Sequence, residues 1–186
     1  MNDNKDKLGV IYEKNDYAGL IKRIIIAVVD LLIILIVMST VLYVSDYMIN
    51  DETTYIKFNF IFFFVFSICY LALLKRSKIR TLGYILTGVK IVDLKGNKPS
   101  IFNMVFRTIL LLAGPFELIF DIIWLMHEST KQTLRDKYVG TYVINNNANP
   151  VGSGRLQSVT LNVLGYNLVY SEVQEKYFNT EKHTTN

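Results

Sequence analysis

The chain has 186 residues, of which 51% are hydrophobic, and a formal net charge of +4. Its mean hydropathy is +0.28, and the apolar residues are concentrated in blocks, which is typical of a membrane protein rather than of a soluble domain. The basic residues flank these blocks, which indicates orientation in a bilayer rather than binding of nucleic acid. Cys69 is the only cysteine, which excludes an intramolecular disulfide.

The first expected element is a transmembrane helix over residues 24–44 (IIIAVVDLLIILIVMSTVLYV), with Asp30 as its one charge. At about 1.5 Å of rise per residue, such a helix spans the ~30 Å core of a bilayer. An ionised carboxylate at that depth needs a partner or a proton. Arg23 lies on the same helix face, about 10 Å from Asp30 along the axis, which is too far for a direct pair.

A second span is expected over residues 58–74 (FNFIFFFVFSICYLALL), at the short limit for crossing a bilayer. The charges on either side of the two spans agree on one orientation, with the polar segment 1–16 in the cytoplasm. The loop between the spans is mainly acidic. The cytoplasmic ends carry basic residues, which are Lys22, Arg23, Lys75, Arg76, Lys78 and Arg80.

A twofold repeat follows the second span. Residues 81–92 read TLGYILTGVKIV and residues 133–144 read TLRDKYVGTYVI, so that Thr-Leu, Gly and a β-branched pair recur at an offset of 52. The β-branched run 89–94 predicts a short strand. We expect both copies on the cytoplasmic side with their strands paired. Ser100 is the expected N-cap of the next helix.

The block 101–126 (IFNMVFRTILLLAGPFELIFDIIWLM) is long enough to cross the membrane once. Gly114-Pro115 breaks it into halves that are too short to span alone, which favours a re-entrant or interfacial hairpin. A third span remains the alternative. The hairpin is preferred because it returns the second repeat to the cytoplasmic side, where its basic residues belong. Residues 145–155 are expected to be a linker, and residues 156–178 to form strands or one amphipathic helix.

Depth along the helices predicts which charges meet. Asp30 and Arg107 both lie six residues, ~9 Å, from the cytoplasmic end of their helices, so we expect them to form a buried pair. Arg23 lies at the membrane surface, where Asp136 from the second repeat can reach it. We expect Arg23 and Asp136 to form their contact on the cytoplasmic side.

Glu117 and Asp121 are then left without a counter-charge. They are one helical turn apart and continue the stripe that begins at Arg107, so the carboxylates could take up a proton or a cation. In the alternative interpretation, the stripe is the wet face of an interfacial helix and the charges are structural. The segment contains no residue pattern that decides between an ion path and structural ion pairs.

The sequence contains no hydrolase, zinc-protease, dithiol or P-loop motif. His127 and His183 have no partners at ligand spacing. We therefore expect no enzymatic activity, no cofactor and no metal site.

Taken together, these segments resemble the RDD family of bacterial membrane proteins. YAGLIKRIIIAVVDLLI is similar to the opening helix of that family, TLGYILTGVKIVDLKGNKPSIFNMVFR to its central cytoplasmic segment, and KQTLRDKYVGTYVI to its closing motif. The arginine and two aspartates that name the family match Arg23, Asp30 and Asp136. An arginine stands before Asp136, where the family often has histidine or another polar residue. Transport, including cation–proton exchange, is implied for the family.

The expected fold is thus an all-α membrane protein with two transmembrane helices, a broken third apolar segment and a small cytoplasmic two-stranded β element. Its RDD-like membrane domain covers residues 17–144, and residues 145–186 form a linker and tail. The first functional hypothesis is a small exchanger of monovalent cations or protons in the cell membrane that uses Asp30. The second is an adaptor or regulator. Both imply a bilayer and further copies or another membrane protein as partners, and neither implies nucleic acid.

Overall fold

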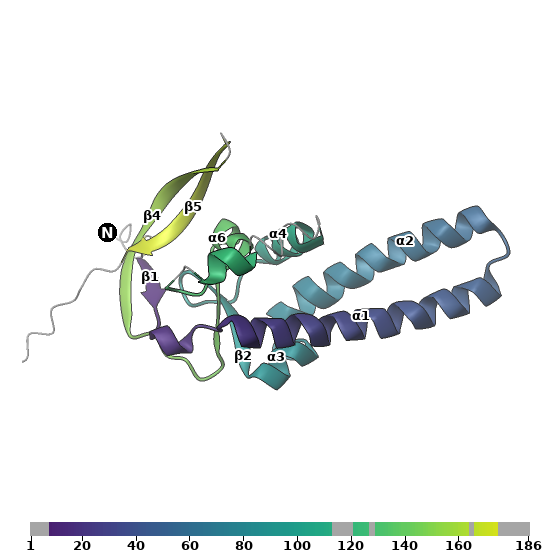
Figure 1. Cartoon of the computed structure of the whole chain (residues 1–186), viewed down its shortest axis with the longest axis horizontal. Coiled ribbons are helices and arrows are strands. Elements are labelled where there is room, and N and C mark those ends of the chain that lie inside the picture. The colour runs from purple at the N-terminus through teal and green to yellow at the C-terminus, as the bar shows by residue number, and fades with distance from the viewer. Residues whose placement is uncertain (1–7, 113–120, 127–128, 164–165, 175–186) are drawn as a thin grey trace, which may run out of the picture.

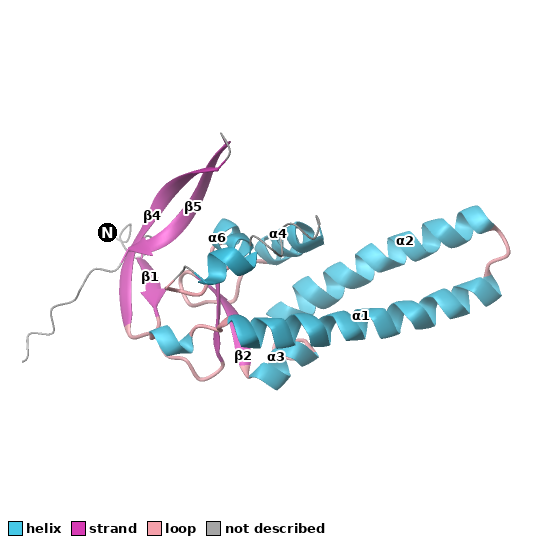
Figure 2. Cartoon of the chain, in the orientation of Figure 1, coloured by secondary structure: helices cyan, strands magenta, loops and turns pink. Residues whose placement is uncertain are grey.

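The computed structural model describes residues 8–112, 121–126, 129–163 and 166–174. A long helical hairpin extends from a base in which short helices and two small antiparallel sheets are packed together (Figures 1 and 2). The sheets were not all expected, because the sequence predicted a single two-stranded element in an otherwise helical chain. Glu117, the Gly114-Pro115 break, His127 and His183 lie outside the described residues.

Two helices form the long hairpin. Helix α1 covers Leu20–Met48, and helix α2 covers Glu52–Ile68 and continues as a π-helix over Cys69–Leu74. Both are long and apolar enough to cross a membrane, with mean hydropathies of 3.0 and 2.0. Most of their large apolar side chains are exposed, as expected for helices whose solvent is lipid. The predicted spans 24–44 and 58–74 lie within these helices.

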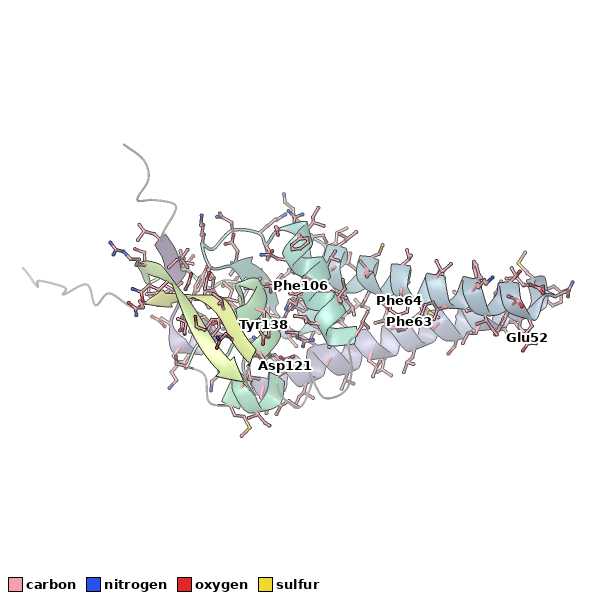
Figure 3. All side chains as sticks on the ribbon, turned by 90° about the horizontal axis from the view of Figure 1, so that it is seen from above. Glu52, Phe63, Phe64, Phe106, Asp121 and Tyr138 are labelled. Atoms are coloured by element: carbon pink, nitrogen blue, oxygen red, sulfur yellow. The ribbon has the colours of Figure 1, made fainter. Side chains whose placement is uncertain are left out.

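Polar contacts connect the two helices of the hairpin near its tip. The Asn59 amide donates to the Ser45 hydroxyl at 3.0 Å, and both side chains are buried between α1 and α2. Asp51 caps α2 by accepting from the Thr54 backbone N–H at 2.7 Å. Glu52 lies at this tip, at the end of the molecule opposite the sheets (Figure 3).

The two copies of the repeat have the same local structure. Each begins with an extended threonine, continues as a six-residue helix, ends at a left-handed glycine with φ of 64° or 63°, and enters a five-residue strand. The strands pair antiparallel with Ile91 opposite Val143, two positions that the repeat offset relates. The predicted pairing is therefore confirmed, and a local pseudo-twofold axis passes between these residues. The elements are α3 (Leu82–Thr87), β2 (Val89–Asp93), α6 (Leu134–Val139) and β3 (Thr141–Asn145).

Helix α4 covers Ile101–Leu112, and its Asn103 N–H donates to the Ser100 hydroxyl at 3.0 Å, as predicted for an N-cap. It packs against the π-helix at the end of α2. Its buried face contains Met104, Arg107 and Thr108. Residues 121–126 are also helical.

The second sheet joins the two ends of the chain. Strand β1 (Leu8–Ile11) pairs with β4 (Gly152–Val163), which pairs in turn with β5 (Tyr166–Gln174). A 3₁₀ turn over Lys14–Asp16 connects β1 to the start of the hairpin. Of the two structures expected for residues 156–178, the described part has strands and not an amphipathic helix. The expected all-α fold with a single two-stranded β element is therefore incomplete. The N-terminal segment and the tail thus share a sheet, which connects two segments that are far apart in the sequence.

The strand pair β2–β3 lies between two apolar clusters, because alternate residues of a strand face opposite sides. One cluster packs the strands against the base of the helical hairpin and α4, with Ile26, Tyr84 and Val143 among its members. The other packs them against the N-terminal segment and contains Tyr12 and Tyr142. Both repeats are thus fixed at the base of α1 and α2.

Candidate functional site

A buried carboxylate, Asp136, joins three helices at the base of the hairpin. It lies in the first turn of α6 and is fully buried. Arg23 of α1 places Nη1 at 2.7 Å from Oδ2, and Arg107 of α4 places Nη2 and Nε at 2.6 and 2.7 Å from Oδ1. The two guanidinium groups approach different oxygens of one carboxylate. These charge-assisted bonds fix α1 and α4 to the second repeat.

The local sequence helps to orient this carboxylate. Thr133 and Asp136 form a capping box, in which each side chain accepts from the other residue's backbone N–H at 3.2 Å. The capping box directs the carboxylate to the N-terminal end of α6. Arg23 also donates to the carbonyl groups of Ala18 and Lys131 at 3.1 and 2.7 Å. The predicted contact between Arg23 and Asp136 is therefore confirmed, and both residues also have backbone partners.

The surroundings of Asp136 favour its charged form. Burial alone would raise the pKa of this carboxyl, but the charges of Arg107, Arg23 and Arg135 and the hydrogen bond from the Thr133 backbone outweigh burial and lower the pKa well below the ordinary value. Asp136 is thus a permanent anion at physiological pH. We infer that it does not carry a proton.

Asp30 has a different partner from the one expected. Its Oδ2 lies 2.9 Å from Nζ of Lys75, and it accepts from Tyr70 Oη at 3.3 Å, Thr81 Oγ1 at 3.2 Å and the Gly83 backbone N–H at 3.3 Å. The predicted pair with Arg107 is wrong, because that arginine binds Asp136.

Two local features allow this arrangement around Asp30. The π-helix at the end of α2 changes the helical phase just before Lys75, and such segments often occur at functional positions. Gly83 lets α3 approach α1 closely, because a Cβ there would lie 2.9 Å from the Ile26 backbone and 3.0 Å from Asp30 Oδ1. The Asp30 carboxylate therefore contacts both the Lys75 ammonium group and the backbone of Gly83.

The third carboxylate of the candidate site, Asp121, pairs with Arg135. The distance from Asp121 Oδ2 to Arg135 Nε is 2.8 Å, but these atoms are not aligned for a hydrogen bond, so the contact is chiefly electrostatic. The Arg135 backbone N–H approaches Oδ1 at 3.4 Å. Gly83 and Arg135 are equivalent positions of the repeat, so each short helix directs its second amide at an aspartate. In Figure 3, Asp121 lies at the base of the molecule.

The predicted charge imbalance is therefore corrected for the described residues. Asp30, Asp121 and Asp136 each have at least one cationic partner within 2.9 Å. The sequence left Glu117 and Asp121 without a counter-charge, because it indicated only an orienting role for Lys75 and no partner for Arg135. Glu117 remains outside the described residues.

Sequence reasoning missed one further interaction. Lys137 is buried, lies 2.9 Å from a Glu172 oxygen of β5, and has its ammonium group over the rings of Tyr170 and Trp124. This contact holds the three-stranded sheet against α6. No spacing in the sequence connects Lys137 with Glu172, since the partner lies in a strand of the tail. Over the described ranges, no group of three or more His, Cys, Asp or Glu residues could hold a metal ion.

Two helices that are long and apolar enough to cross a membrane, a twice-repeated helix–strand unit and a buried charge network at their junction suggest a membrane protein with a folded base. Residues 17–140 match the RDD family. The match covers well over half of the chain and agrees with the resemblance seen in the sequence, so the protein belongs to the RDD family. Searches of curated proteins and of solved structures gave no match.

Proposed function

We propose that this protein is a non-enzymatic membrane adaptor or regulator, in which the hairpin α1–α2 anchors a cytoplasmic binding module made of the repeats and the two sheets. The observation that supports this most strongly is the pairing of Asp30, Asp121 and Asp136 with cations. Removing either partner of a buried ion pair leaves an uncompensated charge that destabilises the folded protein. Charges that are paired in this way support a structural role. The Arg23–Asp136 pair and the hydrogen bonds of Asp30 with Thr81 and Gly83 connect the anchor to the module.

The proposed topology has two spans in the cell membrane with the N-terminus in the cytoplasm, and residues 101–126 as a hairpin that enters and leaves on that side. Arg107 of α4 and Asp121 both lie close to the cluster around Asp136, so the segment begins and ends near one point. The partner would be another membrane protein or a second copy, which contacts both the hairpin and the module.

The adaptor role is tested by site-specific photocrosslinking in the native host. A photoreactive residue at Val169, whose side chain is 63% exposed on β5, reports on the module, and one at Tyr47, which is 89% exposed on α1, reports on the opposite end of the anchor. We expect a discrete protein adduct from Val169. If neither position gives a protein adduct in cells that contain the folded protein, the adaptor role is rejected.

Exchange of monovalent cations or protons through Asp30 is the second candidate function, and one observation favours it. Asp30 lies within the predicted first span, its partner Lys75 directly follows the π-helix, and two hydroxyl groups lie beside the carboxylate. Such a group can exchange a proton when its partner moves. This function requires several copies, because two helices cannot enclose a path. Flux that depends on Asp30 in vesicles of purified protein would support it.

A further inference from the structure

A groove of about 420 Å³ opens at the base of the molecule, apart from the ion-pair network. Four parts of the fold form its walls: the turn after β2, the outer face of α4, the end of α6, and the sheet β4–β5. Asn103 of α4 donates to the Val139 carbonyl at 2.9 Å, which joins two of these walls. Phe106 and Tyr138 mark the groove in Figure 3.

The apolar part of the groove continues onto an exposed helix face. The rings of Phe102 and Phe106 stack on each other along α4, and both are exposed, by 77% and 42%. Ile109 extends the same stripe and is 50% exposed. Because α4 packs beside the end of α2, this stripe lies at the level where the second apolar helix ends. An apolar helix face at that level is suited to the boundary between headgroups and acyl chains.

The polar part of the groove carries an available positive charge. Lys95 lines the groove and is exposed. Its ammonium group forms no ion pair with any residue that the structure describes. The neighbouring Asp93 carboxylate also lines the groove, but it accepts the backbone N–H groups of Lys95 and Asn97 at 2.9 and 2.7 Å. Asp93 is thus engaged in closing the turn, whereas Lys95 is free to meet an anion.

We propose that this groove binds one anionic phospholipid, with its phosphate at Lys95 and an acyl chain along Phe102 and Phe106. The chemical match has three parts: a cation without an ion-pair partner among the described residues, an apolar wall next to it, and continuity with the exposed apolar stripe of α4. This goes beyond the adaptor role and rests only on association with a membrane. An anionic lipid held here would connect α4 to the sheet β4–β5 through the bilayer surface.

The test uses tryptophan fluorescence and lipids with brominated acyl chains, which quench a nearby indole. Trp124 is the only tryptophan, so Trp124→Phe gives a silent background in which Phe102→Trp reports on the groove. The purified protein is placed in phosphatidylcholine vesicles that contain either brominated phosphatidylglycerol or brominated phosphatidylcholine. Ile36→Trp, at a position 63% exposed in the middle of α1, reports on ordinary lipid contact.

We expect the apparent affinity at position 102 to be about fivefold higher for the anionic lipid, the ratio that one lysine near anionic lipid provides. At position 102, the ratio of the affinity for the anionic lipid to the affinity for phosphatidylcholine should fall to about one in Lys95→Gln. The ratio should stay at about fivefold in Lys98→Gln, which changes another lysine of the same turn. At position 36, the ratio should be about one. A ratio near one at position 102, or an equal loss in Lys98→Gln, would overturn the proposal. Size-exclusion profiles and melting temperatures establish that each variant is folded.

Discussion

Arg23 and Asp136 are 113 residues apart in the chain, yet their side chains form a 2.7 Å ion pair at the base of the hairpin. Arg107 approaches the other oxygen of the same carboxylate. One buried anion therefore holds the first membrane helix, α4 and the second repeat together. We expect the integrity of the base to depend on this contact more than on any single apolar residue.

Removing the shared anion should be strongly destabilising. Asp136→Asn leaves two guanidinium groups at the junction without their counter-charge, and breaking a buried ion pair in this way is expected to lower the free energy of unfolding by about 3–5 kcal/mol. The melting temperature in detergent measures the effect. Glu13→Gln, at an exposed carboxylate near the N-terminus, is the control and should change little. Equal melting temperatures for Asp136→Asn and the wild type would contradict the assigned role.

The free energy of unfolding should fall at low pH because of Asp136. Its pKa in the folded protein lies below the ordinary value of 3.8, because the three arginines outweigh burial. The folded state therefore binds this proton less readily than the unfolded state, and stability falls as the proton is taken up. The stabilisation is complete above pH ~4 and is lost as the pH falls toward the lowered pKa. Unfolding of wild type and Asp136→Asn between pH 2.5 and 7 measures it. A difference that stays constant, or grows, as the pH falls from 7 to 2.5 would show that the pKa of Asp136 is not lowered in the folded protein.

The partner of Asp30 can be identified with double-mutant cycles. Asp30→Asn and Lys75→Gln should be non-additive by about 0.5–3 kcal/mol, because each removes the same contact. Asp30→Asn and Arg107→Gln should be closer to additive, since Arg107 binds Asp136. Unfolding in mixed micelles supplies the free energies. Strong coupling of Asp30 with Arg107 and none with Lys75 would contradict the Asp30–Lys75 pair and would support the Asp30–Arg107 pair predicted from the sequence.

The close approach of α3 to α1 should make Gly83 intolerant of a side chain. Gly83→Ala places a Cβ 2.9 Å from the Ile26 backbone, which has to move, and the expected loss of stability is about 1–3 kcal/mol. Gly19→Ala is a matched control, because nothing lies within 4 Å of its Cβ and its φ is −71°. The melting temperatures of both variants, compared with that of the wild type, measure this loss of stability. A neutral Gly83→Ala would mean that α3 and α1 are farther apart than described.

Local patterns in the sequence predicted much of this fold. Long apolar runs located the two long apolar helices, and the repeat offset of 52 predicted that Ile91 and Val143 would lie in paired strands. Ser100 was recognisable as a cap because capping depends on neighbouring residues alone. Each of these features depends on spacing along a short stretch of chain.

The features that sequence reasoning missed depend on which distant segments are neighbours. Counting residues gave Asp30 and Arg107 equal depths, but depth does not say which helices are in contact. The π-helix that precedes Lys75 has no clear sequence signal, so this lysine was treated as an orientation charge. Strand β1 is four residues long and pairs with β4 near the other end of the chain. Such short, distant pairing cannot be derived from periodicity.

The most direct measurement is pH-driven cation flux in vesicles that contain the purified protein, with Asp30→Asn beside the wild type. We predict no flux above protein-free vesicles for either protein, because Asp30 is held in a structural pair with Lys75. Flux by the wild type that disappears in a folded Asp30→Asn variant would contradict the structural role of the pair and would make the protein a carrier.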